Sequence, residues 1–301
     1  MDTSEYDKMY RLEEANWWYV GRRDLVMKMA ARAENGLSEK PLRILDTGCG
    51  TGINLKYLQI LGDVYGLDIS KNALISSRIR GLHSLICGSV EKLPFKDELF
   101  DLVLALDVIE HMDEDISAVR ELYRVLKPGG RLIITVPAFQ FLWTSHDLAL
   151  HHKRRYTRSG LLNILRSSGF ENEKATYWNF FLFLPVAIVR LSKRVHRSGD
   201  AMQTDLAELP TLLNGLLLGL IRIENMILMR FDLPVGISVM CTCRKVSDVK
   251  KGRNVPDMFA ISFMCVRAYV VIAVLCIIYL EEIALLMVGG NQIAQWGQDA
   301  F

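Results

Sequence analysis

The sequence lacks a strong excess of either charge, a disulfide framework and a secretory signal. Its 36 basic and 34 acidic residues give a formal net charge of +2, so the overall charge does not argue for a nucleic-acid partner. The six cysteines show neither a paired framework nor zinc-ligand spacing, which favours free thiols in a reducing compartment. The N-terminal stretch MDTSEYDKMYRLEE has no apolar signal segment. We therefore expect a cytoplasmic globular protein without a nucleic-acid partner.

An alternation of apolar strands and helices begins at residue 42. Strands are predicted at LRILDT, DVYGLDI, HSLICG, FDLVLALDV and RLIITVP, with helical patterns between most of them. Such nearly continuous apolar strands are typical of a parallel sheet that is covered on both faces. The sequence thus predicts an α/β fold with an open, doubly wound sheet, in which ligands bind at the carboxyl ends of the strands.

A glycine-rich turn follows the first predicted strand, in the stretch ILDTGCGTG. A dinucleotide fingerprint requires a third glycine where this chain has Ile53, and the Lys-Ser/Thr pair of a phosphate loop is absent. Asp46 beside the turn repels a pyrophosphate and suits a cationic group. Asp68 ends the second strand 22 residues later, where an acid accepts hydrogen bonds from ribose hydroxyls. The pattern indicates a nucleoside that carries positive charge.

Four motifs occur in order: LDTGCGTG, GLDIS, EKLPFKDELFDLVLALDVIEHMDE and RVLKPGGRLIITVP. Together they resemble class I S-adenosylmethionine-dependent methyltransferases of the type 11 or type 12 grouping, over residues 17–180. The resemblance implies S-adenosyl-L-methionine as the cofactor and two further strands, FENEKATYW and an antiparallel GISVMCTCRK, which complete a mostly parallel seven-stranded sheet. Family members commonly have an acid where this chain has Ser89. The implied cofactor-binding residues are Asp46, Gly48, Cys49, Gly50, Gly52, Asp68, Ile69, Ser89, Val90 and Asp107.

Candidate acceptor-side residues follow the fourth and fifth strands. A long basic loop at the carboxyl edge of a sheet is usually functional, since histidine can act as a base and arginine can bind an anion. The alternative is a solvated loop with a few anchoring residues. We predict no metal site, because His146, Asp147, His151 and His152 lack a recognised spacing. The predicted catalytic residues are His111, His146, His151 and Tyr156, and the predicted substrate-binding residues are Arg154 and Arg155.

The flanking segments have two interpretations each. Residues 1–40 are helical in pattern, and their NWWYVGRR stretch either fills the core or forms a lid in which Arg22 or Arg23 meets the cofactor carboxylate. Residues 41–247 form the predicted methyltransferase domain, with a variable helical cap at about 180–232. In the apolar tail, 248–301, residues 259–280 contain one charge and match a bilayer in length. They either associate with a membrane or pack on the domain.

These observations predict a methyltransferase that moves a methyl group from S-adenosylmethionine to a small-molecule or lipid-like acceptor by in-line displacement. Orientation of the two reactants supplies ~7–11 kcal/mol of such a barrier. The alternative is a non-catalytic protein that keeps the fold for cofactor binding or scaffolding. A nicotinamide oxidoreductase is disfavoured by Ile53 and Asp46.

Overall fold

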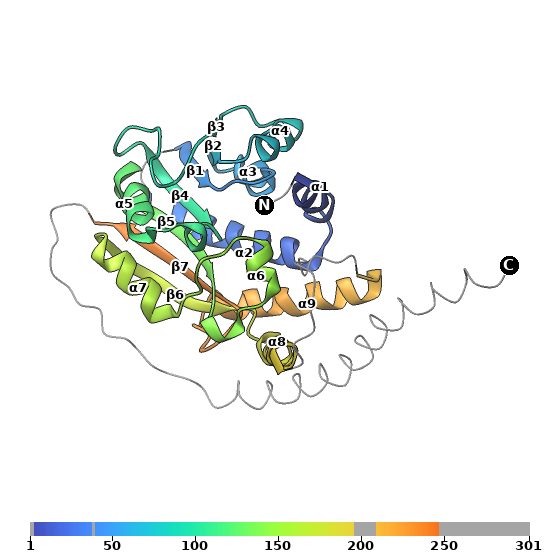
Figure 1. Cartoon of the computed structure of the whole chain (residues 1–301). Coiled ribbons are helices and arrows are strands. Elements are labelled where there is room, and N and C mark those ends of the chain that lie inside the picture. Colours follow the sequence, from blue (N-terminus) through green and yellow to red (C-terminus); the bar gives the residue numbers. More distant parts are fainter. Residues whose placement is uncertain (1–2, 38–39, 196–208, 247–301) are drawn as a thin grey trace.

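The computed structural model describes residues 3–37, 40–195 and 209–246 (Figure 1). Its centre is a seven-stranded sheet in the order β3-β2-β1-β4-β5-β7-β6. The strands are β1 (Leu42–Thr47), β2 (Gly62–Asp68), β3 (Leu85–Cys87), β4 (Phe100–Leu106), β5 (Leu126–Pro137), β6 (Phe170–Trp178) and β7 (Ser238–Lys245). The helices are α1 (Thr3–Leu12), α2 (Trp17–Glu34), α3 (Ile53–Leu58), α4 (Lys71–Ile79), α5 (Asp115–Val125), α6 (Ser145–Ala149), α7 (Arg158–Ser167), α8 (Phe183–Val195) and α9 (Thr211–Leu228), with 3-10 turns η1 (Ile109–His111) and η2 (Gln140–Leu142).

The direction of β7 distinguishes this sheet from an all-parallel one. β7 lies between β5 and β6 and runs antiparallel to both, so that Cys241 faces Ile134 on one side and Ala175 on the other. The predicted doubly wound, mostly parallel seven-stranded sheet is therefore confirmed. β4 is buried along its whole length, as expected for a central strand that is covered on both faces.

Helices cover both faces of the sheet. On one face α5 and α7 pack over alternate strand residues such as Val103 and Ile134. On the other, α2 and α9 pack over their neighbours Leu102 and Ile133. This alternation is the period-two pattern of strands, and it explains why the central strands carry apolar residues on both faces.

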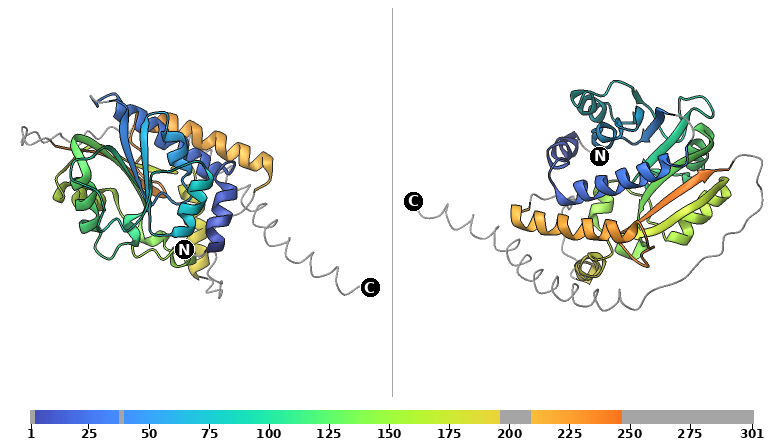
Figure 2. Two further views of the ribbon diagram at one scale, coloured as in Figure 1. Left: turned by 90° about the horizontal axis from the view of Figure 1, so that it is seen from above. Right: turned by 180° about the vertical axis from the view of Figure 1, so that it is seen from behind.

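Helices α2 and α9 are far apart in the sequence and lie side by side (Figure 2). Their axes approach closely because α2 carries Gly21, where an added Cβ atom would lie 2.4 Å from Ile221 Cγ2. Asn225 Nδ2 donates a hydrogen bond to the carbonyl of Gly21 over 2.8 Å, and its Oδ1 accepts one from Trp178 Nε1. The predicted cap region is thus joined to the N-terminal segment and to the end of β6.

Among the described helices, α9 alone is long and apolar enough to cross a membrane, with a mean hydropathy of 1.4. A helix in the core of a globular protein can pass the same criterion, so this is weak evidence for a membrane helix. The predicted membrane segment 259–280 and the rest of the tail, 248–301, lie outside the described residues.

Candidate active site

The glycine turn after β1 is shaped by three glycines in the left-handed region. Gly48, Gly50 and Gly52 have φ angles of +70°, +55° and +79°. A Cβ atom would lie 2.6 Å from the Val108 side chain at Gly48 and 2.5 Å from a leucine at Gly52. At Gly50 the nearest atom is Met9 Cε of α1, at 3.1 Å. Gly48 and Gly52 are therefore needed for packing, whereas at Gly50 the close atom is the end of the flexible Met9 side chain, on the side that faces α1.

Asp46 is a buried acid beside this turn, with 1% of its surface exposed. Within the described part of the chain, neither carboxylate oxygen has a hydrogen-bond partner. Burial raises the pKa of Asp46 to about 7; the Arg22 guanidinium lowers it in part, and the Asp68 carboxylate raises it further. A buried carboxylate without a partner costs free energy, and a bound cation would offset that cost.

Asp68 ends β2 and holds the glycine turn in place. Its Oδ2 accepts from the backbone N–H of Gly50 and its Oδ1 from that of Ser70, both over 2.8 Å. Burial raises the pKa of Asp68, although these backbone donors offset part of the effect. A carboxylate has about four acceptor sites, so these backbone donors do not exhaust the capacity of Asp68 to accept from ribose hydroxyls.

The other predicted cofactor residues differ in exposure. Ile69 is 76% exposed beside Asp68, whereas Val90 is buried. Ser89 Oγ accepts from the backbone N–H of Glu91 over 3.2 Å and so caps the turn after β3. Cys49 is buried, and burial raises the pKa of its thiol, which agrees with a packing role. Their contacts with the cofactor stay predictions.

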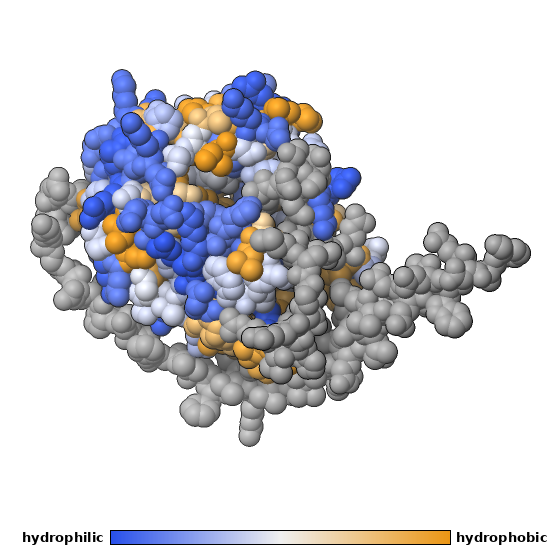
Figure 3. All heavy atoms as spheres, viewed as in Figure 1, coloured by the Kyte–Doolittle hydropathy of each residue, from blue (hydrophilic) through white to orange (hydrophobic). Residues whose placement is uncertain are grey.

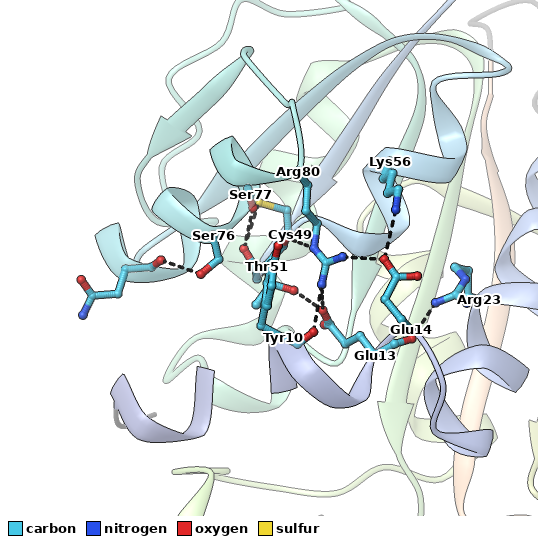
Figure 4. A network of polar contacts seen from close by, with 12 residues as sticks. Tyr10, Glu13, Glu14, Arg23, Cys49, Thr51, Lys56, Ser76, Ser77 and Arg80 are labelled. Carbon is cyan, nitrogen blue, oxygen red and sulfur yellow. Dashed lines mark hydrogen bonds and ion pairs between the residues drawn. The ribbon is translucent and has the colours of Figure 1, made fainter. Parts of the chain in front are cut away.

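The end of α1 and the turn after it are clamped onto the glycine turn (Figure 4). Arg80 contacts the Glu13 and Glu14 carboxylates at 3.0 and 2.9 Å and donates from Nε to the Thr51 carbonyl. Thr51 Oγ1 donates to Glu13, and Arg80 also lies over the Tyr10 ring. α1 therefore has the position expected of a lid over the glycine turn.

Of the two arginines predicted to meet the cofactor, Arg22 lies at the site. Arg22 pairs with Asp107 Oδ2 at 2.5 Å and lies over the Trp18 ring. Arg23 is buried, donates to the Glu13 carbonyl over 2.8 Å and stacks over Tyr57. Arg23 thus anchors α2, and Arg22 is positioned between the ends of β1 and β4.

Asp107 combines an unusual backbone with two side-chain partners. Its φ of +57° is uncommon for a residue other than glycine. Its Oδ1 accepts a hydrogen bond from Thr135 Oγ1 over 3.0 Å, and its Oδ2 accepts one from Arg22. Strained backbone of this kind is found preferentially at functional sites.

The loop after β5 is held by a buried ion pair between Arg155 and Asp147. Arg155 makes two parallel contacts to the Asp147 carboxylate, at 2.8 and 2.9 Å, and donates to the Ala138 carbonyl. His152 Nδ1 lies 2.9 Å from Asp147 Oδ1. Burial alone would raise the pKa of Asp147, but His152 and Arg155 hold it well below its usual range. Arg155, predicted to bind substrate, is engaged in anchoring this loop.

Arg154 and Tyr156 also make anchoring contacts. Both reach Asp115 Oδ2 at the start of α5, at 3.1 and 2.9 Å, and Arg154 also donates to the Asp113 carbonyl. Tyr156 is buried, which raises the pKa of its phenol. The structure thus supports the anchoring interpretation of these residues, and their roles in substrate binding or catalysis stay predictions.

Of the three histidines predicted to be catalytic, only His111 lies against the ring of another described histidine, that of His152. The His111 ring lies 4.8 Å from the ring of His152, whereas His151 is exposed and His146 lies in α6. Burial and the neighbouring His152 lower the pKa of His111 to about 4, so its imidazole is neutral at pH 7. His152 was not among the predicted catalytic residues.

Glu110 follows the fourth predicted strand together with Asp107 and His111, but the sequence pattern assigned it no role. It is fully buried, and no other described residue forms a hydrogen bond with either carboxylate oxygen. Burial, and then the neighbouring Asp107 carboxylate, raise the pKa of Glu110 well above its usual range. Its position after β4 could have indicated the site, because residues that follow neighbouring parallel strands meet at one edge of the sheet.

Comparison with known proteins agrees with this geometry. Residues 45–134 match a family model described as a methyltransferase domain, and this stretch contains the glycine turn, Asp68 and Asp107. This chain contains a domain of the class I S-adenosylmethionine-dependent methyltransferases. The family's cofactor fits the residues present, because the unpartnered Asp46 carboxylate suits a sulfonium or ammonium group.

The chain is similar to proteins of several kinds. It is 29% identical over 166 residues to a "Probable S-adenosylmethionine-dependent methyltransferase" of Mycolicibacterium smegmatis, covering 54% of this chain and 62% of that one. It is 38% identical over 124 residues to the human "Probable tRNA methyltransferase 9B", covering 39% and 26%. The matched part thus spans less than two thirds of either relative.

A solved structure of similar fold is a methyltransferase from Thermotoga maritima. It is 20% identical to this chain, with a TM-score of 0.52, over 80% of this chain and 95% of that one. At this identity the likeness concerns the fold, and it agrees with the strand order described above.

Proposed function

We propose that the protein transfers a methyl group from S-adenosylmethionine to a small apolar or lipid-like acceptor. The observation that carries this proposal is Asp46, a buried carboxylate at a glycine turn that has no hydrogen-bond partner in the described part of the chain. A cationic ligand relieves its desolvation cost, whereas a pyrophosphate would add repulsion.

The chain's own residues divide the work of binding. Asp46 faces the cationic end of the cofactor, Asp68 accepts from ribose hydroxyls, and α1 covers the glycine turn and excludes water. Arg22 contributes positive charge toward Asp46 and Asp107, which suits a cofactor carboxylate. The sulfonium supplies an activated methyl group, so the protein's main contribution is in-line orientation of the acceptor.

The apolar acceptor is supported by the surface of the cap helices. Leu212 and Leu216 of α9 are 78% and 63% exposed, and Ile188 and Leu191 of α8 are about half exposed. Apolar atoms gather at the lower edge of the molecule, where Figure 1 places α8 (Figure 3). Exposed apolar patches mark interaction sites, and this one lies on the helices that follow β6 and precede β7.

Calorimetry with S-adenosylmethionine and, in parallel, NAD tests the cofactor. We expect binding of S-adenosylmethionine alone, and we expect Gly50→Ala to weaken it at least tenfold because the new methyl group enters the space facing α1. The matched control is Gly129→Ala, which has a similar φ of +81° and open space around it. Equal affinity of the two variants would place the cofactor elsewhere.

The acceptor and the activity are tested together by incubating the full chain with labelled cofactor and either lipid extracts or tRNA. We expect label in the lipid fraction. Label in tRNA would contradict the lipid-like acceptor, and cofactor binding without any methylated product would favour a non-catalytic role.

A further inference from the structure

Three potential metal ligands converge at the end of β4. Glu110 and His111 come from η1, and His152 comes from the segment after α6. One carboxylate oxygen and two imidazole nitrogens, one from each residue, all lie within 4.8 Å of one another. All three side chains are at least partly buried, which distinguishes the group from a solvated acidic patch.

Glu110 gives independent evidence for a ligand. Its carboxylate is fully buried, and no other described residue makes a hydrogen bond to either oxygen. A buried polar group in a native protein normally has a partner. A cation held between Glu110 and the two imidazoles would supply one.

The surroundings of His152 resemble those of metal-binding histidines. Its Nδ1 is hydrogen-bonded to Asp147, which leaves Nε2 to bind an ion, and Arg155 fixes Asp147 through two contacts. Metal-bound histidines almost always give their second nitrogen to a carboxylate or a carbonyl. The His111 ring has the equivalent contact with the backbone of His151.

We infer that Glu110, His111 and His152 bind a divalent transition-metal ion, with Asp147 as the residue that positions His152. Two imidazoles and one carboxylate suit Zn²⁺, Fe²⁺, Mn²⁺ or Co²⁺. Ligand atoms around such an ion lie roughly 3–3.5 Å apart at bond lengths of about 2.1 Å, so the side chains close inward by about 1 Å on binding. This inference departs from the sequence-based expectation of no metal, and it makes His111, one of the predicted catalytic residues, a metal ligand.

Three protein ligands leave coordination positions open, and this gives the ion a role that rests on the proposed function. The carboxylate of Asp107 is close enough to raise the pKa of Glu110, so the ion would lie beside the cofactor-binding end of β4. An ion held by Glu110, His111 and His152 would supply Lewis-acid chemistry, which lowers the pKa of an acceptor hydroxyl. The acceptor oxygen would form its bond to the methyl carbon as the bond between that carbon and the sulfonium sulfur breaks, and the hydroxyl proton would pass to water.

The test is titration of the full, chelator-treated chain with Co²⁺, monitored by its visible absorption. We expect one bound equivalent in the parent, and at least hundredfold weaker binding in Glu110→Gln and His152→Ala. His151→Ala is the matched control, since it removes an exposed neighbouring imidazole and should bind Co²⁺ as the parent does. Unchanged binding in Glu110→Gln and His152→Ala, or no binding by the parent, would overturn the site.

Two further measurements test the number of histidine ligands and separate the metal site from the cofactor site. Proton NMR of the Co²⁺-loaded parent should show two shifted imidazole N–H signals, which needs no variant to fold; a different number contradicts two histidine ligands. Calorimetry with S-adenosylmethionine on the same samples separates the proposals. Cofactor binding without Co²⁺ binding refutes the metal site alone, and the converse refutes the cofactor site alone.

Discussion

Two buried aspartates in this protein have opposite surroundings. Asp147, in the loop after β5, is contacted by Arg155 and His152, and its pKa is held well below the usual range. Asp46, beside the glycine turn after β1, has no hydrogen-bond partner among the described residues, and burial raises its pKa to about 7. Both lie at the carboxyl edge of the same sheet.

The presence or absence of side-chain partners distinguishes a residue that maintains the fold from one whose surroundings suit a ligand. Asp147 satisfies its charge within the chain and fixes the loop after β5 through Arg155 and His152. Asp46 lowers the free energy of unfolding of the ligand-free protein, and binding of a cationic ligand would offset this loss. A buried carboxylate that is paired within the chain thus indicates an architectural role, whereas one with no partner for either oxygen among the described residues is a candidate for ligand binding.

The largest expected effect comes from breaking the satisfied pair. Asp147→Asn leaves the Arg155 guanidinium buried without a counter-charge, which should lower the free energy of unfolding by about 3–5 kcal/mol. Urea denaturation measures it. Asp113→Asn removes an exposed partner of Lys153 and should leave the midpoint unchanged; an equal loss in both variants would contradict the contrast.

The next effect has the opposite sign. The folded pKa of Asp46 is about 7, above its ordinary 3.8, so the folded state binds more protons between these values and stability falls as pH rises through them. Asp46→Asn should therefore stabilise the ligand-free protein at pH 8 by up to about 4 kcal/mol, with little change at pH 4. Thermal unfolding across this pH range is the measurement.

Glu224→Gln is the matched control for that variant. Glu224 is also buried with a pKa raised to about 7, although its Oε2 accepts from the backbone N–H of Phe181. Both variants should flatten the pH dependence of stability, but only Asp46→Asn should weaken cofactor binding. Normal cofactor affinity in folded Asp46→Asn protein would end the assignment of Asp46 to the site.

The smallest effect is the pH dependence of cofactor affinity. A cation binds the ionised form of Asp46, so affinity should fall about tenfold for each pH unit below 7 and level off above it. Calorimetry at pH 5.5, 6.5 and 7.5 measures this trend. A flat profile in the parent protein would mean that Asp46 is already ionised at pH 5.5.

The sequence was sufficient to predict the sheet and the glycine turn, because both depend on local patterns. Apolar runs identify buried strands, and the spacing of Asp46, the glycines and Asp68 restricts the ligand class. β6 and β7 came from family resemblance, since an inserted antiparallel strand has no local signature.

The acceptor side depended on contacts that the sequence does not specify. Nothing in HHKRRY indicates that Arg155 turns inward to Asp147 while His151 stays exposed. The clamp between Arg80 and Glu13 likewise joins residues 67 positions apart. Basic residues in a loop can anchor it or bind a ligand with the same chemistry, and only their partners distinguish the two.

The antiparallel insertion of β7 has a consequence for how the chain assembles. β6 is joined to the sheet through β7, which lies between it and β5. β6 therefore cannot pair until residues 238–245 have been synthesised, about 60 residues after its own end. At a synthesis rate of roughly 5–20 residues per second, β5 has an open edge for several seconds. During that interval the nascent chain is most exposed to mispairing, and its completion is a step of high contact order.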